Sequence, residues 1–187
     1  MNRNRDYFHS KISTAPGGKW IIDNGWVWHP WGCVWTWSLE RWLSDNVWES
    51  EDGPTRKRLV DRSYFWDGPL CWIDDATVAI WGWGHDDEWL VPAVQIFDVQ
   101  SGKRLSYFAG PKTTLPRNSP SSMFAQALYF DKYIFAVDDK SGTTVWDVAS
   151  GERLHHDPAL LLVNYHPTSK EFLSIDSDGI KLSRLVE

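Results

Sequence analysis

The feature that most constrains this chain is an eight-residue motif that occurs twice, 49 residues apart. The two copies are Asp98–Leu105, DVQSGKRL, and Asp147–Leu154, DVASGERL, which agree at six of eight positions. Each copy follows a short apolar stretch and contains a Ser-Gly turn, which predicts a β-hairpin. Weaker copies are found at Val34–Leu39 and Gly179–Leu185. Repeats of roughly 40–50 residues with several strands each indicate the blades of a β-propeller.

The strand pattern around these motifs divides the sequence into four predicted blades, over residues 11–66, 70–108, 125–156 and 161–185. The fourth blade has only three predicted strands, one fewer than the others. Asp6–His9 is a further predicted strand that precedes the first blade and does not belong to it. We expect Asp6–His9 to supply the outer strand of the fourth blade, because such closure leaves no open sheet edge at the seam.

Residues 40–62 interrupt the regular pattern of the first blade and are predicted to be an insertion between its third and fourth strands. Within them, Arg41–Leu43 and Lys57–Val60 fit short helices on either side of a Gly-Pro breaker. A second irregularity is Asp23-Asn24-Gly25, which is typical of a tight turn. It leaves open whether Trp26–Trp28 belongs to a loop or begins the third strand of this blade.

Three local features resemble WD40-type propeller repeats: the DVxSGxRL turns, the Trp146-Asp147 dipeptide, and the turns Pro16–Lys19 and Pro167–Lys170. The resemblance covers most of the chain. However, the Gly-His signature of WD40 repeats is missing, only one Trp-Asp pair is in register, and WD40 propellers usually have seven blades. The resemblance therefore implies an all-β, four-bladed WD40-like β-propeller closed by the N-terminal strand or, alternatively, a partial propeller that completes a larger ring. The Trp-rich stretch is also similar to small bacterial proteins, which implies no function.

Length, charge and cysteine content exclude several classes of protein. The 187 residues suffice for one well-buried core, so we expect a single domain over residues 1–187. A net charge of -6 disfavours nucleic acid and anionic membranes as partners. Cys33 and Cys71 are interpreted as core thiols, and the first residues lack the apolar segment of a signal peptide. No apolar run is long enough to span a membrane, and we expect a cytoplasmic protein.

Tryptophan is the unusual component: thirteen of the 14 tryptophans lie between Trp20 and Trp89. Those on predicted strands are expected to be core residues. Five of the others lie in the loops between the second and third strands of the first two blades, which share one face of a propeller. Aromatic side chains with a charged rim are typical of protein-binding surfaces. The predicted partner-binding residues are Trp26, Trp28, Trp31, Trp83, His85, Asp86, Asp87, Glu88 and Trp89.

No motif in the sequence indicates catalysis, and we expect neither a metal nor a cofactor. Asp86–Glu88 is interpreted as a solvated charge run, because consecutive side chains rarely point at one atom. His155 and His156 are adjacent on a predicted strand and therefore face opposite sides. We expect a non-catalytic, monomeric module that binds a basic protein, with an immunity-type inhibitor as one specific form. The alternatives are a carbohydrate-binding or glycoside-cleaving propeller and a self-assembling piece of a larger ring.

Overall fold

The computed structural model describes residues 7–28, 31–63, 65, 68–84, 90–111, 126–176 and 178–185. Within them, fifteen strands form four antiparallel sheets, and in each sheet the strands pair in the order in which they occur along the chain. A sheet whose neighbours are joined by short hairpins is the unit of a propeller blade. The all-β, four-bladed WD40-like β-propeller is thereby confirmed.

Sheet 1 contains β1 (Tyr7–Thr14), β2 (Trp20–Val27), β3 (Trp31–Ser38) and β4 (Lys57–Ser63). Sheet 2 contains β5 (Leu70–Trp72), β6 (Thr77–Trp83), β7 (Val91–Asp98) and β8 (Arg104–Ala109). Sheet 3 contains β9 (Gln126–Asp131), β10 (Tyr133–Asp138), β11 (Gly142–Trp146) and β12 (Arg153–Asp157). Sheet 4 contains β13 (Leu162–His166), β14 (Glu171–Asp176) and β15 (Gly179–Ser183). Helices α1 (Leu39–Ser44) and α2 (Glu49–Asp52) lie between β3 and β4.

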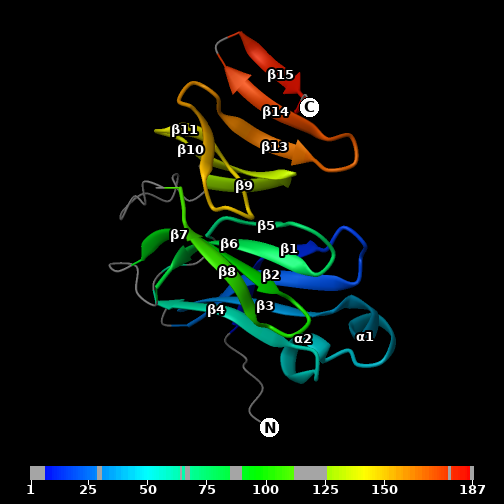
Figure 1. Ribbon diagram of the computed structural model, residues 1–187. Helices are drawn as coiled ribbons and strands as arrows, with labels where there is room; N and C mark the ends of the chain where they lie inside the picture. The colour runs from blue at the N-terminus through cyan, green and yellow to red at the C-terminus, as the bar shows by residue number, and fades with distance from the viewer. Residues whose placement is uncertain are drawn as a thin grey trace.

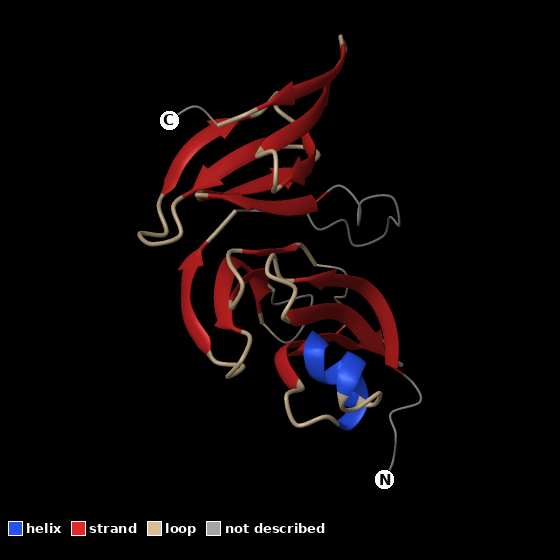
Figure 2. Cartoon of the chain, turned by 90° about the vertical axis from the view of Figure 1, so that its right-hand side faces the viewer, coloured by secondary structure: helices blue, strands red, loops and turns tan. Residues whose placement is uncertain are grey.

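The four sheets follow one another in space as they do in the sequence (Figure 1). Sheet 1 and the two helices lie at the bottom of this view, and sheet 4 lies at the top. The view from the side shows the same succession, with the two helices at one end of the molecule (Figure 2). Sheets 1 and 4 are therefore the two end blades, and sheets 2 and 3 lie between them.

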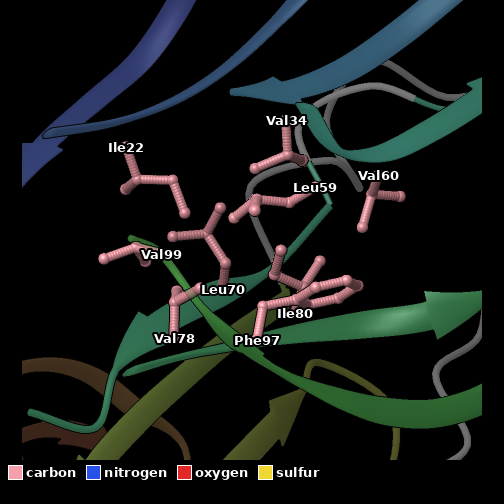
Figure 3. Packing of buried hydrophobic residues seen from close by; sticks show 9 residues of the cluster. All are labelled: Ile22, Val34, Leu59, Val60, Leu70, Val78, Ile80, Phe97 and Val99. Atoms are coloured by element: carbon pink, nitrogen blue, oxygen red, sulfur yellow. The ribbon is translucent and has the colours of Figure 1, made fainter. Parts of the chain in front are cut away.

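Three clusters of buried apolar residues join the sheets in pairs. The first joins sheets 1 and 2 and contains Ile22, Val34, Leu59, Val60, Leu70, Val78, Ile80, Phe97 and Val99 (Figure 3). The second joins sheets 2 and 3 and contains Ala79, Trp81, Val94, Ile96, Leu128, Ile134 and Ala136. The third joins sheets 3 and 4 and contains Phe135, Val137, Leu162 and Phe172. Each of the two middle sheets contributes to two clusters, so burial of apolar surface on both faces holds them in place.

The repeated motif forms the same turn in sheets 2 and 3. The carboxylate of Asp98 accepts a hydrogen bond from the Ser101 backbone N–H at 2.7 Å, and that of Asp147 accepts one from Ser150 at 2.7 Å. The glycine that follows has φ of +71° in both copies. A left-handed backbone of this kind favours glycine, which explains why the Ser-Gly pair recurs.

The predicted closing strand is placed elsewhere, and that part of the prediction is wrong for the residues that the structure describes. Tyr7–His9 belongs to β1, which pairs with β2 in sheet 1, and sheet 4 has three strands in the described part of the chain. The reason is local: the Phe8 ring stacks on Trp26, and His9 contacts the buried Asp23 carboxylate. Asp6 lies outside the described residues.

Two further details of the first blade differ from the predictions. Asp23-Asn24-Gly25 forms no turn, since all three residues lie inside β2, where the Asn24 side-chain amide donates to the Gly68 carbonyl at 2.8 Å. Lys57–Val60 is the first part of β4 and not a helix, so both helices lie before it. Burial of Leu59 and Val60 against sheet 2 explains the strand.

Candidate functional site

Three aromatic side chains form a row at the end of sheet 1 where β2 turns into β3. Phe8 and Trp26 are cross-strand partners on β1 and β2, and their rings stack with centroids 4.3 Å apart. The Trp28 ring lies 6.2 Å from that of Trp26. Phe8 is 44% exposed and Trp28 is 63% exposed. These three residues, which we call the first aromatic cluster, form a row of rings in which Phe8 and Trp28 are exposed to solvent.

A second aromatic cluster, formed by Trp83, Arg104 and Tyr107, lies on sheet 2. The rings of Trp83 and Tyr107 meet edge to face with centroids 4.2 Å apart. The Arg104 guanidinium lies 4.4 Å from the Trp83 ring centroid and donates a 3.0 Å hydrogen bond to the Gln95 side-chain oxygen. Tyr107 is 53% exposed. A cation held over an aromatic face fixes the orientation of both groups.

The two clusters border the interface between sheets 1 and 2 from opposite sides. Trp26 lies on the same side of β2 as Ile22, which packs against sheet 2. Tyr107 pairs with Gln95, which lies on the same side of β7 as Phe97, and Phe97 packs against sheet 1. Trp28 follows β2 and Trp83 ends β6, which are the equivalent strands of adjacent blades. The clusters therefore lie at the same end of two neighbouring blades.

Arg62 connects these two blades beneath the second cluster. Its guanidinium is buried and donates to the carbonyls of Trp81 at 2.6 Å and Gly82 at 3.3 Å. Burial lowers the pKa of Arg62 to about 9. Because it holds the backbone that leads into Trp83, Arg62 fixes the position of that ring relative to sheet 1.

The structure separates Trp31 from the other predicted site residues. Trp31 pairs with Val27 on β2 and with Ser63 on β4, on the face of sheet 1 that points away from sheet 2. His85, Asp86, Asp87, Glu88 and Trp89 lie outside the described residues. Of the predicted set, Trp26 and Trp28 are therefore brought together, and Trp83 lies on the facing sheet.

Phe8, Arg104 and Tyr107 were missed in the sequence. Phe8 had been assigned to the fourth blade, and the correct pairing of β1 with β2 is what places it on Trp26. Tyr107 and Arg104 lie on β8, the outermost strand of the second blade. The register between β7 and β8 would have identified Tyr107 as a site residue, because it places Tyr107 opposite Gln95.

A polar group of side chains occupies the other face of sheet 1. His9 Nδ1 lies 2.5 Å from the buried Asp23 carboxylate. Burial raises the pKa of Asp23, and the neighbouring His9 opposes this effect. The Cys33 thiol contacts the Asp61 carboxylate at 3.7 Å, and burial together with this negative neighbour raises the pKa of Cys33 to about 12. A thiol that stays protonated at neutral pH is a poor nucleophile, so this group has the character of a structural network.

In the described part of the chain, no three His, Cys, Asp or Glu side chains are grouped as a metal site would require. No helix in the same residues is long and apolar enough to cross a membrane.

No protein-family model matches this chain, and no curated protein matches it. Its structure is similar to the C-terminal WD40 domain of Sif2, with a TM-score of 0.50 and 14% identity over 96% of this chain and 44% of that one. It is also similar to the computationally designed Ika4 protein, with a TM-score of 0.51 and 14% identity over 96% of this chain and 94% of that one.

A putative 6-phosphogluconolactonase from Bacteroides uniformis matches with a TM-score of 0.48 and 14% identity over 94% of this chain and 50% of that one. This chain spans less than half of the length of the Sif2 chain that it matches. At 14% identity the similarities to the Sif2 domain and to the designed Ika4 protein concern the fold alone, and they agree with the arrangement of the sheets: the chain has the fold of a WD40-like β-propeller.

Proposed function

We propose that this protein is a non-catalytic protein-interaction module that binds a protein partner across the two aromatic clusters of sheets 1 and 2. The observation that carries the proposal is that Phe8 and Trp28 are exposed on either side of the half-buried Trp26 ring, while the Trp83–Tyr107 pair lies at the same end of the neighbouring sheet. A WD40-like propeller is commonly an interaction scaffold, although a fold by itself does not specify a function.

The side chains of this surface have the properties of a binding hot spot. Trp, Tyr and Arg are the residue types that dominate binding energies, because they bury much area at little conformational cost. Here Trp28 and Tyr107 are more than half exposed, although large aromatic groups are usually buried. Contacts within each cluster hold the rings in place before binding, which reduces the entropy lost on association.

The proposed partner is a basic protein. The chain has a net charge of -6, and the acidic run at 86–88 follows Trp83 in the sequence. Opposite net charges accelerate association and make its rate sensitive to salt. Inhibition of a cationic toxin, as by an immunity protein, is one specific form of this proposal.

Affinity capture from the native host tests the proposal, with the double variant Trp28→Ala/Tyr107→Ala compared with the parent. Trp48→Ala serves as the matched control, because Trp48 is 46% exposed but lies next to α2 in the insertion. We expect one basic protein to be captured by the parent and the control and lost with the double variant. Loss of one hot spot weakens binding by about 30-fold or more.

Capture that is equal for the parent and the double variant would exclude the clusters as the binding site. Titration of the parent with oligosaccharides provides the second readout. Saturable quenching of Trp fluorescence that is lost in Trp28→Ala would replace the protein partner with a carbohydrate.

A further inference from the structure

The face of sheet 4 that points away from sheet 3 is apolar and exposed. Phe172 and Ser174 on β14 are buried toward sheet 3, so the alternate residues Leu173 and Ile175 point outward. Their cross-strand partners on β15 are Leu182 and Ile180. Ile175, Ile180 and Leu182 are 51%, 73% and 67% exposed. These four aliphatic residues form one contiguous patch, which we call the outer patch.

The outer face of the other end blade is already covered. On sheet 1, Ile21, Asp23, Cys33 and Trp37 point away from sheet 2, and all four are at most 3% exposed. The Trp42 ring of α1 meets Trp37 edge to face, and the Arg56 guanidinium lies 3.3 Å from the Trp35 ring centroid. The insertion therefore acts as a cap at this end, as the terminal repeats of a stacked array require.

The charges beside the outer patch are balanced. Glu171 and Arg184, which flank the apolar residues, form an ion pair at 2.9 Å. Two copies of a chain with a net charge of -6 repel each other over most of their surfaces. A neutral, apolar patch is where two copies can approach with the least electrostatic cost and the largest gain from burial.

We propose that the outer patch is a self-association site at which sheet 4 packs face to face against sheet 4 of a second copy. The cap on sheet 1 leaves no bare sheet face there for a head-to-tail contact. The same patch on both copies gives an isologous interface, which closes as a dimer and does not grow into a filament. The proposed dimer differs from the monomer that we expect from the sequence, and it does not depend on the proposed partner-binding surface.

The face of sheet 4 is a better site than the edge of β15. Lys181, in the middle of that edge strand, is held by Asp176 at 2.5 Å and lies 3.8 Å from Asp178. A charged lysine in an edge strand is a device by which proteins discourage strand addition. Ile180 and Leu182, which flank Lys181, point to the opposite side, into the outer patch.

Light scattering over a concentration series tests the proposal. We expect the parent to approach twice its monomer mass of 21.7 kDa, and the Ile180→Lys/Leu182→Lys variant to stay at that mass with an unchanged near-UV spectrum. Ile12→Lys is the control, because Ile12 is 47% exposed on sheet 1 and should leave the dimer intact. A parent that remains monomeric at about 1 mM overturns the proposal, because even weak association is visible there.

A second measurement does not depend on the folding of the lysine variant. Ile180→Cys should be joined into a covalent dimer by a bifunctional maleimide, whereas Leu43→Cys in α1, where Leu43 is 75% exposed, should not. Equal cross-linking of both, or a dimer that only Ile12→Lys disrupts, would place the interface elsewhere, including the head-to-tail contact of a larger ring. Trp28→Ala/Tyr107→Ala should dimerise as the parent does, so the two proposals can fail separately.

Discussion

The two end blades share one strand topology but treat their outward faces in opposite ways. Sheet 1 is covered by the insertion, and Trp37 on its outer face is 1% exposed. Sheet 4 leaves Ile180 73% exposed on the corresponding face. A blade is stable only when its apolar faces are covered, so this difference shows that the first blade carries its own cover and the last does not.

The two blades also differ in what anchors them to the rest of the molecule. Sheet 1 joins sheet 2 through an apolar cluster and through the buried Arg62 guanidinium. Among the described residues, sheet 4 contributes Leu162 and Phe172 alone to the buried part of its cluster with sheet 3. The tryptophans are concentrated in the first half of the sequence, which includes sheet 1, the end sheet whose outer face is covered.

The largest predicted effect concerns the reactivity of the Cys33 thiol on sheet 1. A pKa of about 12 lowers its thiolate fraction at pH 8 about a thousandfold relative to the unfolded chain. Native protein should therefore react slowly with a thiol reagent, and protein in denaturant rapidly. Asp178→Cys, at a turn of sheet 4 where the Asp178 side chain is 78% exposed, is the fast-reacting control. Rapid labelling of native Cys33 would mean that the cover on sheet 1 opens.

The next effect is the cost of removing a large ring from the covered face. Trp37→Ala should lower the free energy of unfolding by about 3–5 kcal/mol, because it leaves a cavity beside Trp42. Denaturant titration followed by circular dichroism measures the loss. A loss below about 1 kcal/mol would show that the insertion does not pack on sheet 1 as described.

A smaller effect separates the two copies of the repeated turn. Gly102 and Gly151 both have φ of +71°, so alanine at either position should cost about 1–2 kcal/mol. Gly151→Ala should cost more, because its new Cβ would lie 2.5 Å from Phe108 Cβ, whereas Gly102→Ala would meet Lys57 at 3.1 Å. Thermal unfolding of the two variants compares them directly, and an equal or reversed order would contradict the contact between each turn and the preceding blade.

The smallest effect is expected on sheet 4. Leu182→Ser should change the stability of the monomer by less than about 0.5 kcal/mol, because Leu182 is 67% exposed. Denaturant titration at low protein concentration isolates the monomer, and the same titration at high concentration should show a larger loss if the outer patch is an interface. A large loss at low concentration would mean that sheet 4 is covered within one chain.

Much of the fold could be predicted from the sequence because it is locally encoded. The motif turns at Asp98 and Asp147 are built from hydrogen bonds within four residues, and their alternating flanks predicted all the strands of the second and third blades. The first blade was less predictable, because Asp23-Asn24-Gly25 follows its tertiary contacts and not its turn propensity. The contact of the buried Asp23 carboxylate with His9 and the hydrogen bond from Asn24 to Gly68 outweigh that local preference.

The candidate site was predictable only in part for the same reason. Trp26, Trp28 and Trp83 were found by composition and loop position, whereas Phe8 and Tyr107 depend on strand pairing between distant residues. Trp31 was grouped with Trp26, but the two-residue period of β3 and its register with β2 place it on the opposite face.

The sequence by itself determined the repeat, the hairpin turns and the number of blades, because these rest on backbone preferences and contacts close in the chain. Only the tertiary structure decided where β1 pairs, which face of sheet 1 is covered and which face of sheet 4 is not. Those outcomes depend on the burial of side chains that are far apart in sequence, and burial is a property of the assembled sheets and not of any one segment.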